Sequence, residues 1–236
     1  MAKKRPKYSM RRYAAICLVG GLAATGLLLW LLAEFHEEMM EPFLSGLDTS
    51  LMAAVHAYTG PQLTGTMEAF TFAGSLAGLV PIVGLLVIVL WIRREWSDGV
   101  MLIVAMLGAG LLMLGLKLHF KRVRPDVPWA LAHEHSFSFP SGHSILAVVL
   151  YGVITYLLWT RVQDWVWRGV IILGALGFIA CIGVSRVYLG VHYPTDVAAG
   201  YFVGLVWLGV VIVSDWDYRR RFAVGTQQIG IAHGKD

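Results

Sequence analysis

The sequence contains few charged residues for its length. Only 14% of its 236 residues are Asp, Glu, Lys or Arg, whereas 57% are hydrophobic. A soluble domain carries nearly twice that charged fraction, and several uncharged runs in this chain are long enough to cross a bilayer. The composition therefore excludes a water-soluble fold and predicts an all-α membrane protein.

Cysteine is also scarce. Cys17 and Cys181 both fall within hydrophobic runs, so a disulfide framework is not expected. No small-residue cleavage site follows the first hydrophobic run, which is therefore interpreted as a retained helix and not as a signal peptide. The sequence has no internal repeat, low-complexity linker or second soluble module. We expect a single domain over residues 1–222, followed by a C-terminal tail, 223–236, that we expect to be unstructured.

The hydrophobic runs predict six transmembrane helices. The predicted spans are residues 14–33, 72–92, 99–116, 142–160, 169–186 and 195–214. Pro81 is expected to kink the second span. The segment 47–58 mixes apolar and polar residues and predicts a helix that lies in the membrane interface. Glycines at small-residue spacing, Gly74-x3-Gly78 and Gly200-x3-Gly204, indicate close helix packing.

Basic residues are absent from the long segment 34–71, and this absence helps to orient the chain. Fourteen of the 19 Lys and Arg residues lie before the first span, after the sixth, or in the second-to-third and fourth-to-fifth connections. The positive-inside rule places these segments, and both termini, on the cytoplasmic side of an inner membrane. This anchoring also explains the net charge of +4, so nucleic-acid binding is not expected.

The five other basic residues lie on the predicted outer side, in or beside three polar clusters. The clusters are Lys117-x6-Arg124-Pro125, Pro140-Ser141-Gly142-His143 and Ser185-Arg186-x5-His192-x3-Asp196. Each cluster flanks an end of one of the last four spans, and successive spans run in opposite directions. All three clusters are therefore expected on the same outer face. Together they supply cations, histidines and a carboxylate, the groups needed to hold a phosphate and attack it through a histidine.

The first two clusters are ambiguous when each is taken alone. Lys117 and Arg124 suit phosphate oxygens, but cations at a span end also anchor lipid headgroups. Ser141 is a good helix N-cap, and Gly142 permits an anion to approach the free amides of a helix start. His143 would then lie beside a bound phosphate; otherwise it is an incidental histidine on a capped helix.

The third cluster offers a more specific arrangement. Arg186 is favoured at the C-terminus of the fifth span by the helix dipole. His192 and Asp196 are four residues apart, close enough for Asp196 to accept the Nδ1 proton and leave Nε2 free as a nucleophile. A polar pair that caps the sixth span is the alternative.

Together, the three motifs resemble the signature of the type 2 phosphatidic acid phosphatase family, whose helical core is related to vanadium haloperoxidases. The resemblance covers about residues 117–196 without a departure in spacing, and the six-span layout extends it over most of the chain. The chain is similar to bacterial membrane lipid phosphatases such as phosphatidylglycerophosphatase B and undecaprenyl diphosphate phosphatases. The resemblance implies a metal-independent phosphatase that forms a phosphohistidine and needs no cofactor.

The resemblance also implies a role for each site residue. His192 would be the nucleophile, Asp196 its orienting partner, and His143 the general acid that later serves as base. The phosphate would be bound by Lys117, Arg124, Ser141, Gly142 and Arg186. The expected partner is a lipid phosphate or diphosphate in the membrane, undecaprenyl diphosphate or phosphatidylglycerophosphate, and no obligate protein partner is indicated.

Other functions remain open at this point. A phosphotransferase would use the same phosphohistidine with a lipid acceptor in place of water, whereas a lipid-binding scaffold would not turn over; a haloperoxidase is disfavoured at a membrane face. Lys121 and Arg122 are expected to attract an anionic headgroup. His133 and His135 form a His-x-His in a loop, but without an evident set of further metal ligands.

Overall fold

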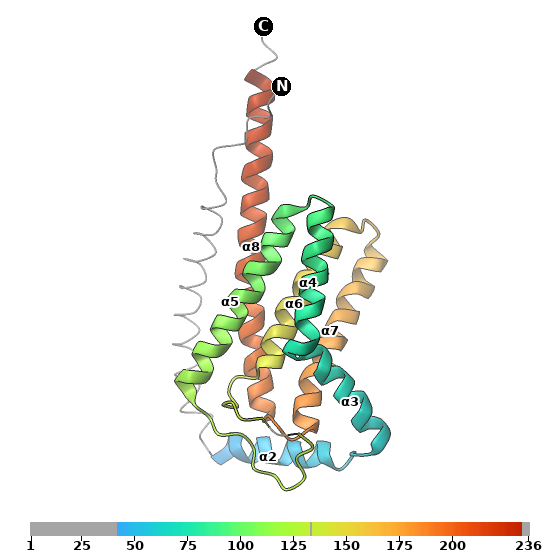
Figure 1. The fold of residues 1–236 in the computed structure, drawn as a ribbon, viewed down its shortest axis with the longest axis vertical. Helices are drawn as coiled ribbons and strands as arrows, with labels where there is room; N and C mark the ends of the chain where they lie inside the picture. Colours follow the sequence, from blue (N-terminus) through green and yellow to red (C-terminus); the bar gives the residue numbers. More distant parts are fainter. Residues whose placement is uncertain (1–41, 133, 233–236) are drawn as a thin grey trace.

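The structure is a computed structural model that describes residues 42–132 and 134–232, and this part of the chain is all helix and loop. Figure 1 shows the helices gathered in one bundle. The helices are α2 (Pro42–His56), α3 (Pro61–Gly74), α4 (Leu76–Ile92), α5 (Trp96–Phe120), α6 (Gly142–Arg161), α7 (Trp165–Tyr188) and α8 (Pro194–Ala232). The all-α prediction is confirmed for the described residues.

Four of these helices are long and apolar enough to cross a membrane: α5, α6, α7 and the part of α8 up to Arg220. They contain the last four predicted spans. The bent pair α3–α4 would make a fifth span if the two helices cross together. The first predicted span, 14–33, lies outside the described residues, so the count of six stays a prediction.

The second predicted span is broken, but not at Pro81. Helices α3 and α4 meet at 51°, and the break is at Ser75. Ser75 has an extended backbone, donates its N–H to Phe72 O and accepts a hydrogen bond on Oγ from Gly78 N. Ser75 therefore caps both helices at once, whereas Pro81 lies inside α4. The kink at Pro81 stays a prediction, and the break that the structure describes lies upstream of it, at Ser75.

Helix α6 is the centre of the bundle. Its buried side chains include Ile145, Val149 and Val153, and it packs against α5, α7 and α8. A Cβ atom at Gly204 of α8 would lie 2.8 Å from Val148 Cβ, too close for a real contact. The glycine spacing on α8 thus permits close approach to α6, as predicted. Gly74 is equally close to α7, whereas Gly78 meets its own chain at the Ser75 break.

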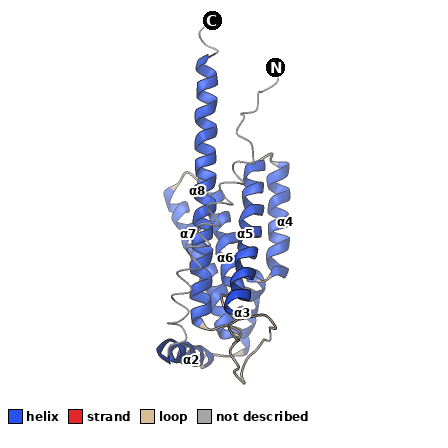
Figure 2. Cartoon of the chain, turned by 90° about the vertical axis from the view of Figure 1, so that its left-hand side faces the viewer, coloured by secondary structure: helices blue, strands red, loops and turns tan. Residues whose placement is uncertain are grey.

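The two ends of the bundle differ. Helix α2 lies across one end, and its position confirms a helix over most of the segment 47–58. At the other end α8 continues past its neighbours to Ala232, as Figure 2 shows. The expectation of an unstructured tail after Phe222 was therefore wrong as far as Ala232.

Candidate active site

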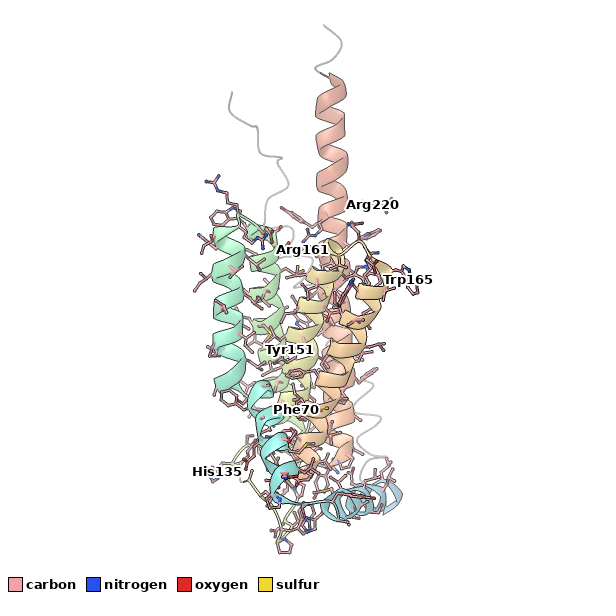
Figure 3. All side chains as sticks on the ribbon, turned by 90° about the vertical axis from the view of Figure 1, so that its right-hand side faces the viewer. Phe70, His135, Tyr151, Arg161, Trp165 and Arg220 are labelled. Atoms are coloured by element: carbon pink, nitrogen blue, oxygen red, sulfur yellow. The ribbon has the colours of Figure 1, made fainter. Side chains whose placement is uncertain are left out.

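The three polar clusters meet at the end of the bundle that α2 crosses. They are carried by four helix ends: Lys117 in the last turn of α5, His143 in the first turn of α6, Arg186 in the last turn of α7, and Asp196 in the first turn of α8. The loop 121–141 adds Arg124. In Figure 3, His135 of this loop lies at one end of the molecule, and Arg161 and Trp165 lie at the other. Alternating helix directions thus bring the clusters together as predicted.

His192 is buried in the short loop between α7 and α8, with both ring nitrogens engaged. Its Nδ1 lies 3.3 Å from Asp196 Oδ2, and its Nε2 lies 3.1 Å from Arg124 Nη1. A guanidinium can only donate, so Nε2 of the neutral ring is the acceptor and Nδ1 carries the proton. This is the tautomer that leaves Nε2 unprotonated, with its lone pair directed at Arg124.

The protonation state of His192 follows from its surroundings. Burial lowers the pKa of His192 to about 4, although the Asp196 carboxylate acts in the opposite direction. The cations Arg124 and Arg186 also lower this pKa. The imidazole is therefore neutral near pH 7, and its Nε2 can act as a nucleophile without first losing a proton.

Asp196 is fully buried and is bound through both carboxylate oxygens. Ser138 Oγ donates to Oδ2 and also lies 3.3 Å from His192 Nδ1, and the Tyr193 backbone N–H donates to the same Oδ2 at 3.0 Å. Arg122 Nη1 donates to Oδ1 at 2.6 Å. Neither Ser138 nor Arg122 stands at a fixed position of the three motifs, so sequence reasoning did not assign them to the site.

Arg124 and Arg186, which come from different segments, converge on one carboxylate. Arg124 Nη2 donates to Glu134 Oε2 at 2.7 Å, and Arg186 Nη2 donates to Glu134 Oε1. Burial alone would raise the pKa of Glu134, but Arg186 and Arg124 together lower it below its usual range. A negative group thus lies between the two guanidinium groups. Sequence reasoning missed Glu134, because a single acidic residue in a loop carries no motif.

Arg186 retains a further hydrogen-bond donor. Its side chain is 3% exposed, and Nη1 donates to Thr71 Oγ1 of α3. Among the described side chains, Arg186 Nε is one of the few buried nitrogen or oxygen atoms without a hydrogen-bond partner. A buried donor of this kind carries a desolvation cost that an anionic ligand would relieve.

The remaining predicted binding residues surround the start of α6. Lys117 is buried, and its Nζ donates to Phe137 O. Ser141 is the N-cap of α6 and accepts from Ser144 N at 3.5 Å, as expected. A Cβ atom at Gly142 would lie 2.4 Å from Met113 Sδ and 3.8 Å from Lys117 Cε. Gly142 therefore allows α5 to approach the helix start closely.

His143 lies on the side of the site that faces α3. A Cβ atom at Gly74 would lie 3.3 Å from His143 Cδ2, so the imidazole packs against the glycine at the end of α3. Arg186, Glu134 and His192 are near enough to act on it electrostatically. The first turn of α6 thus places a second histidine near His192.

The residues that the structure describes contain no group of three or more His, Cys, Asp or Glu side chains that could hold a metal ion. His133 lies outside them, so the His-x-His pair is not placed.

Comparison with known proteins bears on the identity of this site. A model of the PAP2 superfamily matches residues 98–220, which include every residue of the three motifs. The chain belongs to the PAP2 superfamily. Phosphatidylglycerophosphatase B of Bacillus subtilis is 36% identical over 160 residues, covering 67% of this chain and 78% of that protein. An undecaprenyl-diphosphatase of Sulfolobus acidocaldarius is 28% identical over 173 residues, covering 71% of this chain and 78% of that protein.

A solved structure supports the same assignment. The crystal structure of a transmembrane PAP2-type phosphatidylglycerolphosphate phosphatase from Bacillus subtilis superposes with a TM-score of 0.73 at 31% identity. The match covers 84% of this chain and 96% of that one. This PAP2 protein is therefore a multi-pass membrane phosphatase, a hydrolase of phosphate esters that acts in lipid metabolism.

Proposed function

We propose that this PAP2 protein removes phosphate from lipid diphosphates or lipid phosphates, undecaprenyl diphosphate and phosphatidylglycerophosphate being the first candidates, through a phosphohistidine on His192. The observation that carries the proposal is the neutral His192 ring. Its Nδ1 faces Asp196 and its Nε2 lies 3.1 Å from Arg124, one of the two arginines that converge on an anion.

The phosphate is expected where the Glu134 carboxylate now lies. Arg124 and Arg186 already bind two oxygens of one anion at this point, and Lys117 is close enough to interact electrostatically with both arginines and with Glu134. A planar guanidinium suits phosphate oxygens as well as carboxylate oxygens. Charge that spreads over the equatorial oxygens in the transition state would be stabilised by these cations. Ser141 and the Gly142 N–H complete the proposed cradle at the start of α6.

The reaction then proceeds in two displacements. His192 Nε2 attacks phosphorus and the bond to the leaving lipid oxygen breaks. His143, which must be protonated once the anionic phosphate is bound beside it, donates its proton to that oxygen and becomes neutral. In the second step His143 accepts a proton from water, the water oxygen attacks phosphorus, and the phosphorus–nitrogen bond breaks to release phosphate. Nδ1 keeps its proton and donates it in a hydrogen bond to Asp196 throughout, and the carboxylate stabilises the positive charge on the phosphorylated ring.

The site is proposed to face the outer side of the cytoplasmic membrane, with both chain ends inside. Arg161 and Arg220 lie at the end of the bundle opposite to His135 (Figure 3). The connection after α4 adds Arg93 and Arg94 to that opposite end. This distribution is the positive-inside pattern, and the proposed phosphate site lies away from it.

Phosphate release by the purified full-length protein tests the proposal. The substrates are undecaprenyl diphosphate, phosphatidylglycerophosphate, phosphatidic acid and a soluble phosphate ester, all in detergent with EDTA present. We expect release from the lipids that continues in EDTA, is inhibited by vanadate and is lost in His192→Ala.

Two results would contradict the proposal. If the folded wild-type protein releases no phosphate from any of these lipids, it is not a phosphatase for these substrates. Activity that EDTA abolishes would remove the metal-free mechanism. A parallel incubation with an acceptor lipid alcohol distinguishes hydrolysis from phosphate transfer, because a transferase yields a new phosphorylated lipid in place of free phosphate.

A further inference from the structure

We infer that Asp48 of α2 and Arg122 of the loop 121–141 form a buried relay that positions Asp196, and through Asp196 the His192 ring. The inference rests on the proposed role of His192 as nucleophile. It assigns a function to the outer helix α2 and replaces the expected role of Arg122 in attracting lipid headgroups.

Arg122 is directed into the protein and not towards the membrane surface. Its Nη1 donates to Asp196 Oδ1 at 2.6 Å, and its Nη2 donates to Asp48 Oδ2 at 2.9 Å. Its guanidinium also lies 4.2 Å from the centre of the Tyr193 ring. A cation held between two carboxylates has little net attraction left for a distant phosphate, which argues against the headgroup role that the sequence suggested for Arg122.

Asp48 fixes the other end of this arrangement. It is 1% exposed and accepts hydrogen bonds from Thr195 N at 2.9 Å and Thr195 Oγ1 at 2.6 Å. Thr195 also accepts from Arg122 Nη1 at 2.8 Å. Asp48 therefore acts as a cap for the start of α8, supplied by a helix far away in the sequence. This carboxylate adds a polar contact to the apolar packing of Met52 that holds helix α2 beside the active site.

The relay determines how Asp196 can be oriented. Oδ1 of Asp196 is bound by Arg122, while Oδ2 is bound by Ser138 and the Tyr193 N–H and faces His192. A carboxylate held on both oxygens cannot rotate away from the ring, so Nδ1 keeps its partner when Nε2 attacks. Loss of Arg122 would free Oδ1, and a small misplacement of a catalytic group can lower a rate about 100-fold.

The relay also sets the charge that His192 experiences, and this gives it a signature that simple packing lacks. The charged or titratable groups that face His192 are Asp196, Arg124, Arg186, Glu134 and His143. Replacing Arg122 with a neutral residue leaves Asp196 more effectively negative, which raises the pKa of His192. Replacing Asp48 with a neutral residue leaves the positive charge of Arg122 less compensated, which lowers the pKa of His192. The two substitutions act in opposite directions.

The test titrates His192 in the full-length protein in detergent. Proteins labelled with ¹³C-histidine are followed by NMR against pH, and the His192 signal is assigned with His192→Gln. Arg122→Gln should move the His192 midpoint to higher pH and Asp48→Asn to lower pH. Lys121→Gln removes the positive charge next to Arg122 in the sequence and should leave the His192 midpoint unchanged. Because this readout needs no substrate, it stands even if the proposed function fails.

Kinetics on the best lipid substrate supply the second readout. Arg122→Gln is expected to lower kcat about 10- to 100-fold with KM within about twofold of wild type, and Arg122→Lys to recover part of the loss. A raised KM with unchanged kcat would restore the headgroup role and overturn the relay. Midpoints that both stay unchanged, or that both move in the same direction, would also overturn it. If the wild-type protein releases no phosphate but the two variants shift the His192 midpoint in opposite directions, the proposed function is rejected and the relay is supported.

Discussion

Each end of the bundle holds a cluster of ion pairs, and the two clusters differ in their burial. The inner cluster, at the end proposed to face the cytoplasm, consists of Arg93, Arg161 and Arg219 with Glu95, Asp98 and Asp215. The outer cluster, at the end that carries the candidate active site, consists of Arg122, Arg124 and Arg186 with Asp48, Glu134 and Asp196. The arginine side chains are 39–69% exposed in the inner cluster and 3–12% exposed in the outer one. The buried Lys117 lies beside the outer cluster as a further cation without an ion pair among the described residues, so a phosphate would bring this end closer to neutrality.

The way the arginines are used differs as well. At the inner end both oxygens of Asp98 are bound, one by Arg161 of α6 and the other by Arg219 of α8. This pairing joins α5, α6 and α8. At the outer end Arg186 keeps a buried donor, Nε, without a partner, and two histidines lie beside the cations. The buried atom without a partner in the inner cluster is an acceptor, Asp215 Oδ1, which would not bind an anion. The comparison separates an ion cluster that holds helices together from one that can receive a ligand.

The largest expected effect comes from one arginine at each end. Arg186→Gln should lower kcat/KM about 10³-fold, because an arginine on the transferring phosphoryl group is worth that much or more. Arg219→Gln, the matched change at the inner end, should leave kcat/KM within about threefold of wild type, since no catalytic group is near it. Initial rates on the same lipid in EDTA measure both. Equal losses in the two variants would break the distinction between the clusters.

The second effect concerns His143. His143→Gln should lower kcat about 10²- to 10⁴-fold on a lipid substrate, the usual contribution of a general acid or base. A soluble ester with a good leaving group, such as p-nitrophenyl phosphate, needs no proton on its leaving oxygen. The burst of p-nitrophenol should therefore survive in this variant while the steady rate falls. Equal loss of burst and steady rate would argue against the acid role.

The grouping of the motif residues at one end of the bundle could be predicted from sequence because it depends on simple features. Lys117, Arg186 and Asp196 stand at ends of hydrophobic spans, and alternation of span direction is enough to bring such ends to one face. The all-α fold and the close approach of α8 to α6 follow equally from composition and glycine spacing. These features need only local patterns and the thickness of a bilayer.

Other parts of the site depend on contacts that no local pattern encodes. Asp48 reaches Thr195, and Ser138 reaches Asp196, across long stretches of chain. Glu134 shows no periodicity, so its place between two arginines could not be foreseen. The break at Ser75 was missed for a related reason. Sequence-based rules for helix kinks depend mainly on proline, and the residues around a serine do not reveal whether it caps two helices at once.

A smaller effect is expected from Glu134. A phosphate that binds Arg124 and Arg186 must displace this carboxylate, so Glu134→Gln should lower KM and the inhibition constant for vanadate about three- to tenfold, with little change in kcat. Asp126→Asn is the matched control, since Asp126 lies in the same loop and forms no ion pair with either arginine in the described structure. A raised KM in Glu134→Gln would show instead that the carboxylate holds the arginines in place for substrate.

The smallest effect on activity, and the clearest effect on stability, is expected at the inner end. Asp98→Asn keeps the shape of the side chain but removes the charge that binds Arg161 and Arg219. Hydrogen bonds to charged groups contribute about 1.5–3 kcal/mol each, and a loss of about 2 kcal/mol lowers the Tm of a chain of this size by roughly 4–8 °C. Thermal unfolding in detergent measures the Tm, with the exposed Glu68→Gln of α3 as a control that should change it little. Below the new Tm, kcat and KM should match wild type, because the charge removed binds three helices and no substrate. A normal Tm with impaired turnover would place the inner cluster in the catalytic cycle and reverse the assignment of the two ends.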